Sequence, residues 1–187
     1  MPGPYFHKKG WNPFSYKGKL YTLDHLDEFE IAVVDTAGTT RRIAVTFGDH
    51  CFTKKPVDPD PQLVYPDSDR NPGHFCFDRY ALSLDLPNHI LTATQGQVWN
   101  AAGDSFAVIP IVDNAGREIV YRIVFSLERV KGLPVELHMR VKTAYPADNT
   151  PFATFGSIRF RHLVALVAKN QKPKRITDAR RKRPRIS

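Results

Sequence analysis

Three apolar segments that alternate with polar residues constrain the fold of this chain more than any other feature. They cover residues 105–112, 119–127 and 135–145, and each of the two loops between them contains a glycine. Alternation with a period of two is typical of strands that bury one face, because successive side chains of a strand point to opposite sides. Short loops can join only antiparallel neighbours. We therefore predict a three-stranded antiparallel meander.

A hairpin and a helix complete the expected fold. Residues 29–35 and 42–47 are β-rich segments around a loop that contains Gly38, which predicts a hairpin. Near the C-terminus, Ser157 is a suitable cap for a helix that runs to about Asn170, with apolar residues at helical spacing. The fold class is therefore α+β: a twisted antiparallel β-sheet, made of a meander plus a hairpin, with one or two packed helices.

The remaining segments are less regular. Residues 1–27 are rich in Pro, Gly and aromatic residues and are expected to form an irregular N-terminal arm. Residues 54–73 contain five prolines, which exclude a central strand or a continuous helix, so we predict a long surface loop. Residues 74–89 fit a mixed segment, which Pro87 should end. The length suits one domain, residues 1–170.

Positive charge is concentrated at the C-terminus. The chain carries 27 Lys and Arg against 19 Asp and Glu, a net charge of +8, and residues 169–187 alone account for that excess. With almost no apolar groups, residues 171–187 should form a disordered basic tail that is attracted to phosphate backbones. The tail residues expected to bind nucleic acid are Lys172, Lys174, Arg175, Arg180, Arg181, Lys182, Arg183 and Arg185.

The chain has neither a membrane-length apolar stretch nor the apolar core of a secretory signal, so we expect a cytoplasmic protein with no membrane contact. The two cysteines, Cys51 and Cys76, lie among apolar residues. This setting favours buried thiols in a reducing compartment, although one bridge between them stays open.

One face of the last meander strand is expected to be cationic. With a turn at residues 131–133, Arg122 would lie opposite Lys142, Val124 opposite Arg140 and Ser126 opposite His138. Like charges across a strand pair repel, so this face is either a phosphate site or a solvated surface. The other face should join the core, through Val135, Leu137, Met139 and Val141.

This strand ends in Val141-Lys-Thr-Ala-Tyr-Pro146, which resembles the final-strand signature of the barnase/EndoU/colicin/RelE-like superfamily of metal-independent RNase toxins. The resemblance implies attack of the ribose 2′-OH on the adjacent phosphate, with Lys142, Thr143 and Tyr145 at the site. The family's N-terminal helical segment with a catalytic His is not recognisable here. Strict alternation would also place Thr143 and Tyr145 on the core side of the strand.

Such cleavage needs a base, an acid and positive charge around the phosphorane. His50 and His138 are the candidate bases, and Arg79 and Arg122 are the candidate charge stabilisers, with Arg140 expected to bind nucleic acid. We expect no metal or other cofactor. The expected partner is RNA or another nucleic acid, and an antitoxin or immunity protein is a further candidate partner.

Three alternatives remain open. Two neighbouring His and Cys pairs suggest a zinc site, although the spacing lacks a typical knuckle. Either cysteine is also a candidate nucleophile, without a clear activating group. A non-catalytic basic RNA- or DNA-binding protein needs only the tail and the cationic face, and exposed aromatic residues would help it by stacking on bases. The residues concerned are His50, Cys51, His74 and Cys76 for zinc, and Phe75, Phe77 and Tyr80 for stacking.

Overall fold

The computed structural model describes residues 5–6, 10–56, 60–67, 73–101, 104–113, 115–147 and 156–173, and every structural statement below concerns these residues. The expected basic tail lies outside them, apart from residues 171–173. No helix within these ranges is both long and apolar enough to cross a lipid bilayer.

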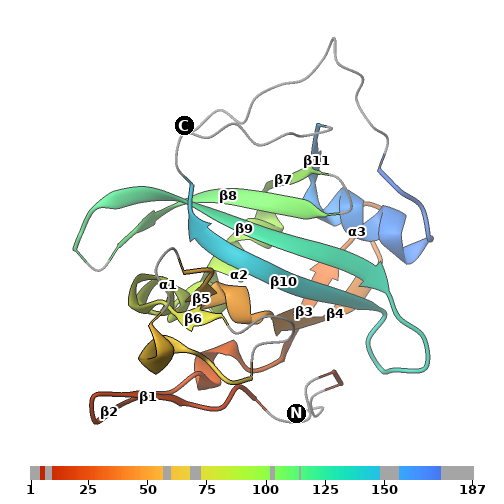
Figure 1. Cartoon of the computed structure of the whole chain (residues 1–187). Helices are drawn as coiled ribbons and strands as arrows, with labels where there is room; N and C mark the ends of the chain where they lie inside the picture. The colour runs from red at the N-terminus through yellow and green to blue at the C-terminus, as the bar shows by residue number, and fades with distance from the viewer. Residues whose placement is uncertain are drawn as a thin grey trace.

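A curled sheet of seven described strands forms the centre of the molecule (Figure 1). Its order is β11-β7-β8-β9-β10-β4-β3, and every neighbouring pair is antiparallel except β4 and β10. The strands are β3 (Phe29–Val34), β4 (Thr40–Phe47), β7 (Gln97–Asn100), β8 (Ser105–Val112), β9 (Glu118–Arg129), β10 (Leu137–Pro146) and β11 (Ser157–Arg159). The expected hairpin is β3–β4 and the expected meander is β8–β9–β10, so both are confirmed.

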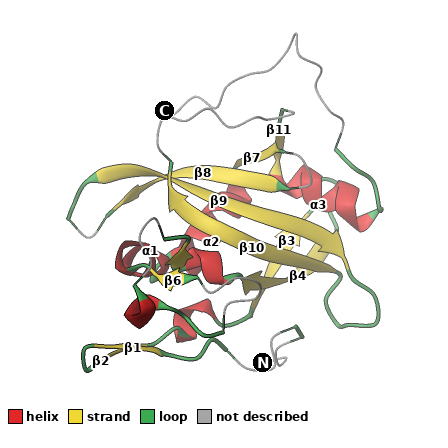
Figure 2. Ribbon diagram, in the orientation of Figure 1, coloured by secondary structure: helices red, strands yellow, loops and turns green. Residues whose placement is uncertain are grey.

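Three α-helices and several short elements pack around the sheet (Figure 2). The helices are α1 (Phe77–Ser83), α2 (Leu86–Gln95) and α3 (Phe160–Ala168). The short strands pair as β1 (Phe14–Tyr16) with β2 (Lys19–Tyr21), and β5 (Thr53–Lys54) with β6 (His74–Phe75). Single 3₁₀ turns are η1 (Asp24–Leu26), η2 (Asp49–Cys51) and η3 (Pro61–Leu63). The fold class is α+β, as expected.

The core lies between one face of the sheet and the helices. Helices α2 and α3 contribute Ile90 and Leu163, which are buried in one cluster with Ile123, Phe125 and Met139 of the sheet. The expected core residues of β10, namely Leu137, Met139 and Val141, belong to this cluster, and Val135 just before the strand is also buried. Burial of these side chains provides the main driving force for folding.

Two boundaries differ from expectation. Pro87 lies in the first turn of α2 and begins this helix instead of ending the segment, because a helix N-terminus tolerates a residue that lacks an N–H. Residues 157–159 pair with β7 as strand β11, so α3 begins at Phe160 and not after a cap at Ser157. Local propensity alone does not reveal that residues 157–159 pair with β7.

The register of β10 also differs from expectation. Arg122 pairs with Tyr145 and not with Lys142, Ser126 pairs with Arg140, and Glu128 pairs with His138. Part of the shift arises because the β9–β10 loop is longer than a tight turn, closing with a hydrogen bond from Val130 N to Glu136 O. The rest arises from a β-bulge between Val141 and Thr143.

This bulge reverses the alternation of side chains at the end of β10. Val141 and Ala144 are both buried, whereas Lys142 is exposed and Thr143 and Tyr145 are half-buried. A bulge places two residues of one strand opposite one residue of its neighbour, so every later side chain changes face. The core-side placement expected for Thr143 and Tyr145 is therefore wrong, and both lie on the face that carries Arg122.

Candidate functional site

Five of the candidate residues gather where β10 ends, and we call Arg79, Arg122, Lys142, Thr143 and Tyr145 the Tyr145 cluster. Arg122 Nη1 donates a hydrogen bond of 3.3 Å to the Tyr145 hydroxyl. The guanidinium carbon of Arg122 also lies 5.6 Å from the centroid of the Tyr145 ring and 5.7 Å from that of Phe106. Cation–π contacts of this length fix a guanidinium beside aromatic faces.

Arg79 approaches the same tyrosine from α1. Its guanidinium carbon lies 5.8 Å from the Tyr145 ring centroid. Its Nη1 donates to the carbonyl oxygens of His50 and Thr53, each at 2.8 Å. Arg79 therefore ties α1 to η2 and β5, and brings a second positive charge to Tyr145.

The turn that carries His50 is fixed against β10. Thr143 Oγ1 donates to the His50 carbonyl oxygen at 3.2 Å, the same oxygen that Arg79 contacts. Gly48 N donates to Val141 O at 2.7 Å. A Cβ at Gly48 would lie 3.1 Å from the Lys142 carbonyl oxygen, so a glycine permits this close approach. The backbone of His50, an exposed residue, is thus held beside the Tyr145 cluster.

Lys142 extends across β9 toward the start of β8. Its Nζ lies 2.6 Å from Asp104 Oδ1, and 45% of the lysine side chain is accessible to solvent. A half-exposed ion pair of this kind contributes little to stability, with typical values of about 0–1 kcal/mol. The Asp104 side chain is less exposed than the lysine, at 23%.

His138 occupies a different place. Its Nε2 lies 2.8 Å from Thr46 Oγ1, its Nδ1 lies 3.3 Å from Glu128 Oε1, and its ring stacks on Phe6 at 3.8 Å. It is separated from Tyr145 by seven positions of β10, or about 20 Å of strand. This separation is too long for His138 to act with the Tyr145 cluster, and His138 is also buried.

Of the other candidates for binding nucleic acid, the structure describes only Arg140 and Lys172. Arg140 is exposed and lies opposite Ser126 on one side and Thr46 on the other. Lys172 is exposed at the edge of a pocket of about 540 Å³ that Asp104 also lines. The remaining residues lie outside the described ranges: Lys174, Arg175, Arg180, Arg181, Lys182, Arg183 and Arg185.

The geometry does not favour the alternatives based on cysteine. Cys51 and Cys76 are free, buried thiols, so no bridge joins them. Burial raises the pKa of Cys51 to about 12, which keeps it a protonated thiol and a poor nucleophile. Within the described ranges, no group of three or more His, Cys, Asp or Glu side chains is arranged to hold a metal ion.

The proposed stacking surface is part of the interior. Phe75 is buried, and Phe77 and Tyr80 are partly buried against the core. All three contact Tyr21 through their rings, as part of a larger aromatic cluster. These side chains therefore stabilise the packing of β1–β2 on α1 and do not form an open platform for bases.

Two residues of the site were not expected from the sequence. Asp104 pairs with Lys142, and Phe106 packs on the guanidinium of Arg122. Phe106 lies opposite Val124, on the same face of the sheet as Arg122. Correct strand registers would have placed it near Arg122, whereas the contact between Lys142 and Asp104 depends on the bulge.

The fold and this site define an α+β protein with a cationic and aromatic cluster on the face of a curled sheet opposite the core. The chain belongs to the YjaZ family, whose model matches residues 13–168 and so covers the sheet, all three helices and the Tyr145 cluster. No curated protein and no solved structure matches the chain.

Proposed function

We propose that this protein is a metal-independent endoribonuclease that acts at the Tyr145 cluster. The observation that carries the proposal is the bulge at Lys142, which turns Thr143 and Tyr145 toward Arg122 and away from the core. The resemblance of residues 141–146 to a strand of known RNase toxins supports the same chemistry. An RNA substrate also fits a cytoplasmic location, which we include in the proposal.

The chemistry follows from the groups at the site. His50 removes the proton of the ribose 2′-OH, the 2′-oxygen forms a bond to phosphorus, and the bond from phosphorus to the 5′-oxygen breaks. Tyr145 accepts a hydrogen bond from Arg122, so its own proton remains available for the leaving 5′-oxygen. Lys142, which is exposed, stabilises the negative charge of the phosphorane, and the buried Arg122 holds the Tyr145 hydroxyl in place. The products are a 2′,3′-cyclic phosphate and a 5′-hydroxyl.

The rest of the interface binds the RNA backbone. Arg140 and Lys172 are exposed, and the residues that follow Lys172 carry most of the net positive charge of the chain. Phosphate contacts of this kind supply affinity without reading sequence. Selection of RNA over DNA then depends on the 2′-OH as the nucleophile.

A non-catalytic nucleic-acid-binding protein is the second candidate. The observation in its favour is that Arg79 donates to two backbone carbonyls and Lys142 is paired with Asp104. Cations with such structural partners can hold a phosphate without promoting cleavage. The two functions differ in whether bound RNA is cut.

The test uses a labelled single-stranded RNA incubated with the purified protein in EDTA. We expect fragments with 2′,3′-cyclic phosphate ends. Tyr145→Phe removes the proposed acid but keeps the ring between Arg79 and Arg122, and we expect a loss of about 10²–10⁴-fold in cleavage rate. Lys142→Ala should also slow cleavage.

Two histidine variants provide a matched comparison. His50→Asn should slow cleavage by a similar factor, whereas His162→Asn, an exposed position on α3, should have no effect. Cleavage that stops in EDTA would contradict the metal-independent mechanism. Binding without any cleavage, unchanged in Tyr145→Phe, would favour the second candidate.

A further inference from the structure

Strand β3 is at the edge of the sheet and pairs with β4 on one side only. In an antiparallel pair, successive residues point their N–H and C=O alternately toward the partner and away from it. The hydrogen bond from Asp35 N to Thr39 O sets this alternation in the β3–β4 hairpin. Val33 therefore bonds to β4, and the backbone groups of Ala32 and Val34 point outward.

A hydrogen bond on the other side of β4 gives the same alternation of inward and outward backbone groups. Arg42, which is the partner of Ala32, accepts a hydrogen bond from Glu136 N on the side away from β3. Its carbonyl is thus turned toward β10, as expected for a pair that is not hydrogen bonded across β3 and β4. Two observations therefore agree on which residues of β3 expose their backbone groups.

Ala32 and Val34 face an open groove. No described residue donates or accepts a hydrogen bond at their outward N–H and C=O groups. The groove measures about 650 Å³ and lies between β3 and the segment that joins α2 to β7. Val34 is 58% exposed. The groove is lined by residues 32–34 and 94–97 and by Arg159 and Arg161.

This edge lacks the usual protection against strand pairing. Natural edge strands are protected by lysines, prolines, bulges or inward charges, and residues 32–34 have none of these. The outward groups of Ala32 and Val34 offer two donors and two acceptors in the spacing of a strand ladder. They are therefore available to an extended chain, which would gain main-chain hydrogen bonds there.

The charges of the groove select the kind of chain. Arg159 and Arg161 are exposed, and the described lining includes no acidic side chain to neutralise them. A carboxylate on the added strand would match a guanidinium in geometry and in charge. A basic strand would be repelled.

We propose that β3 binds an extended acidic peptide by strand addition, through the backbone of Ala32 and Val34 and the side chains of Arg159 and Arg161. The site is separate from the Tyr145 cluster and does not depend on the proposed ribonuclease activity. Its partner is a protein segment with alternating apolar and acidic residues and no proline.

The probe is a seven-residue peptide of alternating valine and glutamate, with blocked ends, added to the ¹⁵N-labelled full chain. We expect the amide protons of Ala32 and Val34 to exchange at least tenfold more slowly when the peptide is bound. The amide of Val33 should change little, because it already bonds to β4. The same peptide with lysine in place of glutamate should bind at least tenfold more weakly.

Three variants separate pairing from charge. Ala32→Pro removes only an outward N–H and should abolish binding. If this variant does not fold, Arg161→Glu tests the site independently, since the side chain is exposed, and should weaken binding tenfold or more. Lys131→Glu makes the same change of charge in the exposed β9–β10 loop and should have no effect.

Three results would overturn the proposal. One is equal binding of the glutamate and lysine peptides. Another is slower exchange that excludes Ala32 and Val34. The third is protection of these amides without peptide, with exchange becoming slower as the protein concentration rises. A second copy of the chain would then occupy the edge.

Discussion

Cys51 is a thiol that lies beside the candidate site and is kept uncharged by burial. The thiol is fully buried, and its Sγ lies 3.9 Å from Val141 O, to which it donates. Burial raises the pKa of Cys51 to about 12 and outweighs the opposite effect of the Arg79 charge. At neutral pH this residue is therefore a small, uncharged packing group between η2 and β10.

We predict that neither cysteine reacts rapidly with a disulfide reagent such as DTNB in the native protein at pH 7. Reaction requires an accessible thiolate, and both thiols are buried. In concentrated guanidinium, both should react within the mixing time of the assay. Rapid labelling of Cys51 in the native state would contradict the burial that raises its pKa and would restore it as a candidate nucleophile.

At this scale, residue type identified more of the site than strand geometry did. Charge and the resemblance of residues 141–146 selected Lys142, Thr143 and Tyr145, and these lie together with Arg122 and Arg79. The prediction for His138 depends on an assumed register, which the longer β9–β10 loop shifts by two residues. A shift of this kind depends on loop packing, which no residue of the loop specifies by its type.

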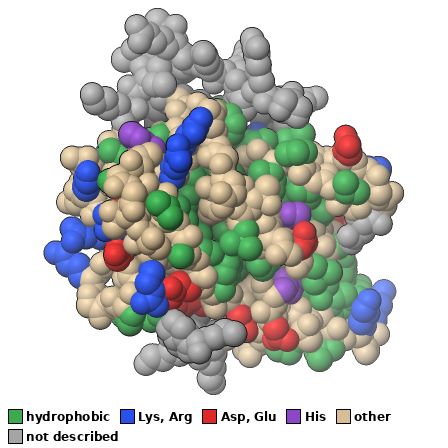
Figure 3. All heavy atoms as spheres, turned by 180° about the vertical axis from the view of Figure 1, so that it is seen from behind, with side chains coloured by type: hydrophobic (Ala, Val, Ile, Leu, Met, Phe, Trp, Pro, Cys, Tyr) green, Lys and Arg blue, Asp and Glu red, His purple; other side chains and the backbone are tan. Residues whose placement is uncertain are grey.

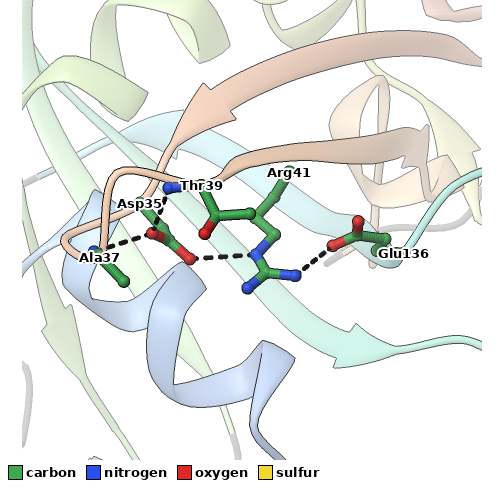
Figure 4. Close-up of polar contacts among 5 residues, drawn as sticks. All are labelled: Asp35, Ala37, Thr39, Arg41 and Glu136. Carbon is green, nitrogen blue, oxygen red and sulfur yellow. Dashed lines mark hydrogen bonds and ion pairs between the residues drawn. The ribbon is translucent and has the colours of Figure 1, made fainter.

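Two hairpins of the sheet use the same turn. Asp35 and Asp113 each accept hydrogen bonds from the backbone N–H groups two and four residues later, and each pairs with an arginine. The third residue after each aspartate is a glycine with φ of 79° or 76°, a conformation that favours glycine. Asp-x-Ala-Gly is thus a local signal for these turns. Asp35 has one more connection, since its partner Arg41 also contacts Glu136 at 2.8 Å (Figure 4).

Replacing Asp35 with Asn should destabilise the protein in a pH-dependent manner. The hydrogen bond from Thr39 N, followed by the Arg41 and Ala37 contacts, lowers the pKa of Asp35. A carboxyl whose pKa is lower in the folded state stabilises the fold above its unfolded pKa, about 3.9, and this contribution is lost as the pH falls. Thermal unfolding should show a midpoint several degrees lower for Asp35→Asn at pH 7, and a much smaller difference at about pH 3.

Asp113→Asn is the matched control, because the pKa of Asp113 is also lowered, first by its hydrogen bond with the Arg117 side chain. No described residue outside this turn is paired with Asp113 or Arg117, so we expect the same pH dependence with a smaller shift. Equal midpoint differences at the two pH values would show that the charge of Asp35 is not the cause.

At the scale of elements, alternation and turn residues were sufficient for the meander and for the β3–β4 hairpin. The short strands β7 and β11 were missed, because three or four residues give little periodicity and their pairing is set by distant partners. Residues 77–95 form two helices although their apolar residues also fit a strand. Packing of these helices against the sheet resolves this ambiguity. The sequence alone does not specify that packing.

For the whole molecule, the distribution of charge separates a nearly neutral body from a basic end. Residues 169–187 contain nine Lys and Arg and one Asp, which equals the net charge of +8 of the entire chain. On the face seen from behind, Lys and Arg of the described body occupy several separate places around apolar patches (Figure 3). The body therefore carries local charge clusters such as the Tyr145 cluster, and the net positive charge of the chain is concentrated in the tail.

Deleting Lys172–Ser187 should leave the fold intact and weaken binding to nucleic acid. The helix α3 before the tail is closed by its own hydrogen bonds, including Gln171 N to Leu166 O, so the midpoint of thermal unfolding should change by no more than a few degrees. Each lost phosphate contact lowers the slope of log K against log salt by about 0.7 for single strands. Binding of a labelled single-stranded RNA at several salt concentrations measures this slope, and we expect a clear decrease. A variant of the same length with the tail Lys and Arg replaced by Ser separates charge from length and should match the deletion. An unchanged slope would mean that the body, and not the tail, makes the phosphate contacts.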